Sequence, residues 1–315
     1  MSFWKDARVL VTAGNGFTGS HLCRELLNSG AHVRTIVKPS SVLSNLSDIS
    51  ENIEICPGDI TDFDSLMQNM KGIDYVFNPA AIVPVNLARQ FPQKTFTVNG
   101  IGAFNVGYAA MKNKVKKMLH VSSCHIYGNV SENELPLKES VTPIVGDLYA
   151  ASKYAAEIYL RALINEGFPI VFSRGFAIFG PGQGPQFLIP RIITQILRGE
   201  PLRLGNSLPT RDYSYIVNIV RGLMVVLEKG SSGEVYHLSS QTERSVGQVC
   251  DSIIQALNVK VKPEWNLTEN RPLDIMRLFG DSSKIRSLGW EPTISFEDGL
   301  DRTVAWWKKE LSVAI

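Results

Sequence analysis

Residues 11–22 read VTAGNGFTGSHL and place Gly14, Gly16 and Gly19 between an apolar run and a helical pattern. The apolar run at residues 8–12 is typical of a buried strand, and leucines at helical spacing follow the glycines. A glycine turn between strand and helix lets the backbone approach a phosphate, which the free N–H groups of the helix start can bind. The segment therefore predicts a dinucleotide-binding turn, and the alternative is a plain tight turn.

Five further apolar runs follow, at residues 32–37, 53–56, 74–77, 117–122 and 169–173, with helical segments between most of them. This alternation predicts a parallel sheet covered on both faces, with ligands at the carboxyl ends of its strands. We therefore expect an α/β fold with a Rossmann-type doubly wound parallel sheet. The predicted divisions are a dinucleotide-binding domain at 1–180, to which 212–245 return, and a smaller C-terminal substrate-binding lobe at 181–211 and 246–315.

The composition narrows the class of protein. Among 315 residues, 44% are hydrophobic and 20% are charged, which excludes disordered and fibrous chains. The formal charge of +2 gives no field that would recruit nucleic acid or a membrane surface. The four cysteines are scattered, so neither a disulfide framework nor a metal site is indicated, and no apolar run is long enough to span a membrane. We expect a cytoplasmic protein with reduced thiols.

Tyr149 and Lys153 lie four residues apart in the segment YAASK, which places them on one face of a predicted helix. An ammonium beside a phenol favours the phenolate and lowers the pKa of the tyrosine. Tyr149 could then remove a proton from a hydroxyl while hydride leaves the carbon. The pair predicts a catalytic base and its activator.

Three segments together resemble the extended short-chain dehydrogenases/reductases, in their nucleotide-sugar epimerase and dehydratase group. They are the turn at 12–19, in which Ala13 replaces the first glycine of the family pattern, the strand end VSSCHIYG at 121–128, and YAASK at 149–153. The resemblance implies that Ser123 hydrogen-bonds the same substrate oxygen as Tyr149. It also implies a cofactor site formed by Ala13, Gly14, Gly16, Phe17, Thr18, Gly19, Lys38, Asp59, Ile60, Ala80, Ala81, Asn99, Tyr149 and Lys153, in which Asn99 supports the lysine.

The end of the second predicted strand bears on the choice between NAD and NADP. A carboxylate there would bind the adenosine ribose and repel a 2′-phosphate, but the chain reads Val37-Lys38. Lys38, together with Arg34, could instead contact that phosphate. NADP is therefore favoured slightly over NAD, and the alternative is a lysine that is simply solvated.

Cys124 and His125 bear on the type of reaction, because the 4,6-dehydratases of this group carry an acid–base pair of carboxylic acids at these places. A thiol and an imidazole can also transfer protons. Cys124 as acid and His125 as base would allow elimination or a proton shift next to a C4 ketone. The alternative is that Cys124 packs and His125 lines the pocket.

The later motifs imply a nucleotide-diphosphate sugar as substrate. Arg211 in RDYSYI and Arg271 in NRPLD match family arginines that clamp a pyrophosphate, and Phe187 is expected to border the substrate pocket. The leading prediction is an NAD(P)-dependent epimerase or dehydratase that oxidises C4 transiently. The alternatives are an NADPH-dependent reductase of a 4-keto sugar or other carbonyl, and a non-catalytic NADP-binding scaffold or redox sensor. The family also implies a homodimer formed through residues 102–112 and 149–163.

Overall fold

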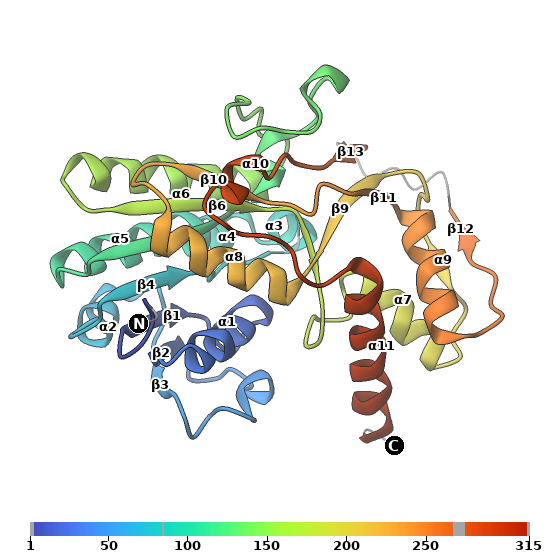
Figure 1. The fold of residues 1–315 in the computed structure, drawn as a ribbon, viewed down its shortest axis with the longest axis horizontal. Coiled ribbons are helices and arrows are strands. Elements are labelled where there is room, and N and C mark those ends of the chain that lie inside the picture. Colours follow the sequence, from blue (N-terminus) through green and yellow to red (C-terminus); the bar gives the residue numbers. More distant parts are fainter. Residues whose placement is uncertain (1–2, 84, 267–274, 314–315) are drawn as a thin grey trace.

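The computed structural model describes residues 3–83, 85–266 and 275–313, and a seven-stranded parallel sheet lies at its centre (Figure 1). The strand order is β10-β6-β5-β4-β1-β2-β3, so the predicted doubly wound fold is confirmed. For the six strands predicted from the sequence, predicted and observed bounds agree within two residues, whereas β10 was not predicted as a strand. The strands are β1 (Arg8–Thr12), β2 (His32–Val37), β3 (Glu54–Pro57), β4 (Tyr75–Asn78), β5 (Lys117–Ser123), β6 (Ile170–Gly175) and β10 (Val235–Leu238).

Helices cover both faces of this sheet because its strands alternate apolar side chains between the two sides. Val9 and Val11 pack with Leu22 of α1, whereas Leu10 packs with Leu66 of α2 in a separate cluster. One face carries α1 (Phe17–Asn28) and α8 (Ile216–Lys229), and the other carries α2 (Phe63–Asn69), α5 (Ala103–Lys112) and α6 (Leu148–Asn165). The result is a three-layer sandwich.

The order of the strands reverses beside β1, whose neighbours are β2 on one side and β4 on the other. A crevice outside the carboxyl ends of the strands at such a reversal is where open α/β sheets bind ligands. Thr12 and Asn78 lie at these two ends, and the Thr12 hydroxyl donates to Asn78 Oδ1 at 2.7 Å. The topology therefore places the candidate site above β1, β4 and β5.

Short elements form the rim of this crevice. A π-helical turn, η2, interrupts the run from α4 to α5, and η3 continues directly from β5. Turns of the π type are rare and often lie at functional sites. The short elements are η1 (Ser44–Leu46), α3 (Val85–Gln90), α4 (Pro92–Phe96), η2 (Thr97–Gly102), η3 (Cys124–Tyr127) and η4 (Glu132–Glu134).

The later part of the chain builds a smaller group of elements to one side of the main sheet (Figure 1). Strand β9 pairs with β7 and β13 in parallel and with β11 in antiparallel fashion, while β8 pairs with β12. Helices α7, α9 and α11 pack against one another. The elements are β7 (Ala177–Phe179), α7 (Leu188–Leu197), β8 (Arg203–Leu204), β9 (Thr210–Tyr215), β11 (Glu243–Ser245), α9 (Val246–Leu257), β12 (Glu264–Trp265), β13 (Arg277–Leu278) and α11 (Phe296–Val313). Helix α10 (Ser283–Arg286) instead packs against β10 of the main sheet.

Candidate active site

The turn between β1 and α1 leaves no room for a side chain at Gly14 or Gly19. A Cβ on Gly19 would lie 2.3 Å from the Ala13 carbonyl oxygen, and one on Gly14 would lie 2.2 Å from Thr35 Oγ1. Ala13 itself has φ of +49°, in the left-handed region that favours glycine. Gly16 is the N-cap of α1 and offers no side-chain cap, so the first N–H groups of the helix are available to an anion.

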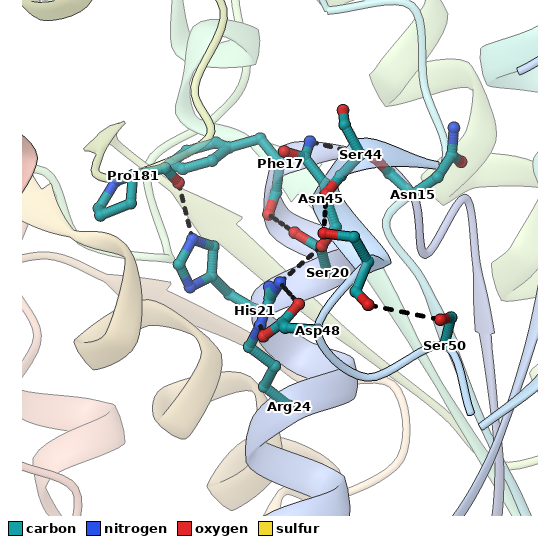
Figure 2. A network of polar contacts seen from close by, with 11 residues as sticks. Asn15, Phe17, Ser20, His21, Arg24, Ser44, Asn45, Asp48, Ser50 and Pro181 are labelled. Atoms are coloured by element: carbon teal, nitrogen blue, oxygen red, sulfur yellow. Dashed lines mark hydrogen bonds and ion pairs between the residues drawn. The ribbon is translucent and has the colours of Figure 1, made fainter. Parts of the chain in front are cut away.

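Polar contacts hold this turn against two other loops (Figure 2). The Asn45 amide donates to the Asn15 carbonyl at 3.2 Å, and Arg24 pairs with Asp48, so the loop after β2 is tied to α1. His21 Nε2 lies 2.8 Å from the Pro181 carbonyl oxygen, which ties the same helix to the loop after β7. The turn between β1 and α1 is thus held in place by segments that are far away in sequence.

A cavity of about 470 Å³ opens beside this turn and contains several of the predicted cofactor residues. Lys38 Nζ lies 2.8 Å from Asp59 Oδ2 at its rim, and the Thr61 N–H donates to Asp59 Oδ1 at 3.0 Å. Burial raises the pKa of Asp59, but the hydrogen bonds from Lys38 and Thr61 outweigh burial, so the pKa is lowered. The lining residues include Ala13, Lys38, Asp59, Ile60, Ala80, Ala81 and Val98.

The expected partnership of Arg34 with Lys38 is wrong. Arg34 Nε lies 2.7 Å from Glu54 Oε2, and its guanidinium also donates to the Asn69 carbonyl oxygen at 2.9 Å. It lines a separate depression with Arg8, where β2 begins rather than where it ends. The sequence of the strand could not predict this, because the direction of the Arg34 side chain is set by its contacts with β3 and α2.

Ser123, Tyr149 and Lys153 come together at the carboxyl end of β5. Their exposed fractions are 6%, 6% and 1%, and the Ser123 hydroxyl lies close enough to the Tyr149 phenol to act on its pKa. Lys153 Nζ donates to the Val121 carbonyl oxygen at 2.6 Å, so the ammonium is anchored to the strand. Helix α6 supplies both the phenol and the amine, as their spacing of four predicts.

The pKa of Tyr149 differs from the one expected from its spacing to Lys153. Burial raises the pKa of Tyr149 to about 12, although the Ser123 hydrogen bond opposes the shift. Burial also lowers the pKa of Lys153 to about 8, against the pull of Glu157. The predicted lowering of the tyrosine pKa by Lys153 is therefore wrong for the protein without ligand, because desolvation disfavours both charged forms.

Asn99 supports the catalytic helix through a neighbour of the lysine. Its side chain accepts from the Ile82 N–H at 2.7 Å and donates to Ser152 Oγ at 2.9 Å. The Ser152 hydroxyl in turn donates to the Tyr149 carbonyl oxygen at 2.7 Å. The π-helical turn carrying Asn99 thus joins the loop after β4 to the first turn of α6.

A buried chain of polar groups, absent from the predictions, lies behind the catalytic helix. Glu157 accepts two hydrogen bonds from Arg174, at 3.0 and 2.7 Å, and Arg174 donates to the Tyr127 hydroxyl at 2.6 Å. That hydroxyl lies 2.6 Å from His237 Nε2, while His237 Nδ1 lies 3.1 Å from the Leu137 carbonyl oxygen. Burial lowers the pKa of His237 to about 3, so the ring is neutral, donates from Nδ1 and accepts the tyrosine proton at Nε2.

This chain joins α6, β6, η3 and β10, and so holds the turn after Ser123 in place. One signal could have revealed part of it: Glu157 follows Lys153 by four residues, as Lys153 follows Tyr149, on a helix face that must be buried. The other members come from distant segments and carry no local signature.

Cys124 and His125 have different surroundings although they are adjacent. The Cys124 side chain packs in an apolar cluster with Phe176 and Leu278, and burial raises the pKa of its thiol to about 12. The His125 side chain is 31% exposed, and its ring meets the Tyr149 ring edge-on with centroids 5.9 Å apart. Packing suits Cys124 better than acid catalysis, whereas His125 lies where a base could act.

On the substrate side, Arg211 lies in β9, and its charge acts on the Cys124 thiol, which places it near the catalytic turn. The next residue, Asp212, is fully buried and accepts from Ser239, Ser240 and Gln241, which fixes β9 to the strand end beside it. Phe187 is the N-cap residue of α7. Arg271 falls in 267–274, outside the described residues.

Within the described residues, no group of three or more His, Cys, Asp or Glu side chains is arranged to hold a metal ion. No helix in that part of the chain combines the length and the apolar character needed to cross a membrane. All four cysteines are free thiols.

Known proteins resemble this chain over nearly its whole length. A family model described as GDP-mannose 4,6 dehydratase matches residues 10–303. Human dTDP-D-glucose 4,6-dehydratase is 31% identical, across 96% of this chain and 90% of that protein. An Arabidopsis thaliana trifunctional UDP-glucose 4,6-dehydratase/UDP-4-keto-6-deoxy-D-glucose 3,5-epimerase/UDP-4-keto-L-rhamnose-reductase is 29% identical across 98% of this chain, which spans only 48% of its length.

Solved structures agree with this picture. UDP-glucose 4-epimerase from Thermotoga maritima, determined with UDP-glucose, has a TM-score of 0.90 at 28% identity and covers 96% of this chain and 99% of its own. A dTDP-glucose 4,6-dehydratase from Streptomyces venezuelae with NAD bound has a TM-score of 0.90 at 28% identity, with coverages of 97% and 98%.

Proposed function

The chain belongs to the extended short-chain dehydrogenase/reductase family, in its nucleotide-sugar epimerase/dehydratase group, and we propose that it epimerises a nucleotide-diphosphate sugar through transient oxidation at C4. The observation that carries the proposal is the buried trio at the end of β5, in which the Ser123 hydroxyl lies near the Tyr149 phenol, with Lys153 one turn further along α6. Epimerisation is favoured over loss of water because the Cys124 thiol is buried among apolar side chains and makes a poor acid.

The residues of the turn and cavity fit a dinucleotide. The uncapped start of α1 and the glycines that exclude a Cβ suit a pyrophosphate, and Asp59 suits an adenine amine. An oxidised nicotinamide bound there would supply a hydride acceptor and a positive charge that favours a phenolate. The residues proposed to hold the cofactor are Ala13, Gly14, Gly16, Phe17, Thr18, Gly19, Lys38, Asp59, Ile60, Ala80, Ala81, Asn99, Tyr149 and Lys153.

Each member of the trio has one task in this proposal. Tyr149 removes the proton of the C4 hydroxyl and returns it when the ketone is reduced again. Ser123 hydrogen-bonds the same oxygen and holds it beside the phenol. Lys153 binds the ribose hydroxyls and offsets the charge of the phenolate. Arg211 and Arg271 are proposed to bind the diphosphate, and Phe187 to border the sugar or base.

The cofactor choice rests on the end of β2. The structure of the related dehydratase contains NAD, whereas Lys38 in this chain favours NADP slightly. Lys38 must leave Asp59 to reach a 2′-phosphate, and both side chains are exposed enough to allow this. Because Lys38 also favours a reductase that consumes NADPH, net reduction of a 4-keto sugar is the second candidate, and a cofactor-binding scaffold without activity is the third.

We also propose a homodimer formed through α5 and α6, with residues 102–112 and 149–163 in the interface. Ile158 and Tyr159 of α6 are each 55% exposed, and Ile101 at the start of this region is 47% exposed. A second copy would cover these apolar side chains in one continuous face. Light scattering of the purified protein should give twice the monomer mass.

The test of the catalytic assignment is Tyr149→Phe, with UDP-glucose and dTDP-glucose as probes. Turnover should fall by at least about 100-fold, since general acid–base catalysis contributes that much or more. Dinucleotide affinity should stay within a few-fold. The matched control is Tyr154→Phe on the same helix, which should keep full turnover.

Two results would decide against the proposal. Unchanged turnover in Tyr149→Phe would remove Tyr149 as the base. Stoichiometric loss of absorbance at the reduced-nicotinamide band, with no C4 epimer seen by NMR, would identify a reductase instead.

A further inference from the structure

Asp147 lies two residues before Tyr149 and is the N-cap residue of α6. Its Oδ1 accepts from the Ala150 N–H at 2.8 Å, which fixes the carboxylate at the start of the catalytic helix. Its second oxygen, Oδ2, lies 3.8 Å from His125 Nδ1. The cap therefore leaves one carboxylate oxygen directed at an imidazole that borders the candidate active site.

His125 is fixed from its other side by the catalytic turn. The backbone N–H of His125 donates to Ser123 Oγ at 3.2 Å, and the His125 ring lies edge-on to the Tyr149 ring. His125 Nδ1 is buried and has no partner within hydrogen-bond distance among the described residues. Asp147 Oδ2 is therefore the acceptor placed to take a hydrogen bond from an Nδ1–H group. Such contacts are often long in ligand-free sites and shorten when substrate is bound.

The charge at Asp147 suits this task. Burial raises the pKa of Asp147, but the nearby His125 ring and the hydrogen bond from the Ala150 N–H outweigh burial, so the pKa is lowered and the group is a carboxylate at neutral pH. A carboxylate at one ring nitrogen of a histidine holds the proton there and leaves the other nitrogen as the base. For His125 the free nitrogen is Nε2, on the side of the ring away from Asp147.

We propose that Asp147 is a positioning residue that holds His125 in the Nδ1–H tautomer, so that Nε2 exchanges the proton on a sugar carbon next to the C4 ketone. This rests on the proposed function, which supplies the ketone. Nε2 takes the proton, the C–H electron pair forms the C=C bond of an enolate, and the carbonyl π pair moves to O4. Ser123 and Tyr149 hydrogen-bond that oxyanion, and the imidazolium then returns the proton to carbon.

Cys124 does not complete an acid–base pair with this histidine, because its thiol is enclosed by Phe176, Leu278 and their neighbours. A site with one base and no acid at a leaving group exchanges protons at carbon without expelling water. The inferred chemistry is therefore proton exchange at C3 or C5 of a 4-keto nucleotide sugar.

The first test uses Asp147→Asn in the full-length protein without substrate. Asparagine caps a helix about as well as aspartate, so α6 should keep its start while the carboxylate charge is lost. Side-chain ¹⁵N NMR, with the His125 signal assigned from His125→Gln, should show mainly the Nδ1–H tautomer in the unmodified protein. In Asp147→Asn the population should shift to the Nε2–H form that predominates for free histidine.

The matched control is Asp62→Asn, which changes the N-cap of α2, where Asp62 accepts from the Ser65 N–H at 3.1 Å. It should leave the His125 tautomer unchanged. An Nε2–H tautomer in the unmodified protein, or the same tautomer in Asp147→Asn, would overturn the role of Asp147.

The second test measures exchange with UDP-glucose and dTDP-glucose in D₂O. Deuterium at C3 or C5 should enter the sugar, and its incorporation per C4 hydride transfer should fall at least about tenfold in Asp147→Asn. C4 epimerisation with no deuterium at either carbon would overturn the exchange while the proposed function stands. Absence of hydride transfer with both sugars would overturn the proposed function and the exchange, but the tautomer measurement would still decide the role of Asp147.

Discussion

The ion pairs Arg174–Glu157 and Lys38–Asp59 have N–O distances of 2.7 and 2.8 Å, but their surroundings differ. The first pair is 5% and 0% exposed and packs behind α6, and the second is 47% and 33% exposed at the rim of the cavity beside the turn after β1. The buried pair belongs to a chain of groups whose other members are also satisfied. The side chains of the exposed pair are solvated, so Lys38 and Asp59 can each leave the other for another partner.

Burial changes what each pair can do. Removing one member of a buried pair leaves an uncompensated charge in a medium that solvates it poorly, so the pair holds elements together. An exposed pair contributes little to stability, and its cation remains available to a ligand. We therefore expect substitutions in the buried pair to change the stability of the fold. Substitutions in the exposed Lys38–Asp59 pair should instead change the affinity for the proposed cofactor.

The largest effect should follow Arg174→Met, which leaves Glu157 charged and buried. We expect the free energy of unfolding to fall by about 3–5 kcal/mol, measured by urea denaturation. Arg203→Met is the control, because the Arg203–Glu264 pair is 73% and 66% exposed and should change stability by less than about 1 kcal/mol. Equal losses in the two variants would remove the distinction between buried and exposed pairs.

A smaller effect should follow Lys153→Met and depend on pH. Burial lowers the pKa of Lys153 to about 8, so between pH 8 and about 10.4 the unfolded chain binds this proton and the folded chain does not. The stability of the unmodified protein relative to the variant should therefore rise with pH across this window, by up to about 3 kcal/mol. A stability difference that does not change with pH across this window would contradict the desolvation of Lys153.

The smallest effect should follow Lys38→Ala at the exposed end. Affinity for NADP should fall by up to about fivefold, because an exposed charge pair is worth less than about 1 kcal/mol, and the loss should shrink at high salt. Affinity for NAD should not fall. Calorimetric titrations with both dinucleotides at low and high salt measure this, and an equal loss for the two would show that Lys38 does not read the 2′-phosphate.

Much of the fold could be predicted because its signals are local. The alternation of apolar runs and helical segments predicts the sheet, and the glycines at 14, 16 and 19 predict the turn. Tyr149 and Lys153 could be paired because four residues make about one helical turn. Arg34 was placed wrongly because β3 and α2 direct it, and neither is near it in sequence.

The sequence alone determined the fold class, the glycine turn after β1 and the placement of Tyr149 and Lys153 on one helix, because each depends on neighbours within one or two turns of chain. Only the tertiary structure decided which polar groups meet in the interior: Arg174 with Glu157, the Tyr127 hydroxyl with His237, and Asp147 with His125. It also decided that burial disfavours the charged forms of both Tyr149 and Lys153. The physical reason is that desolvation depends on everything packed around a group, and that environment is assembled from distant segments.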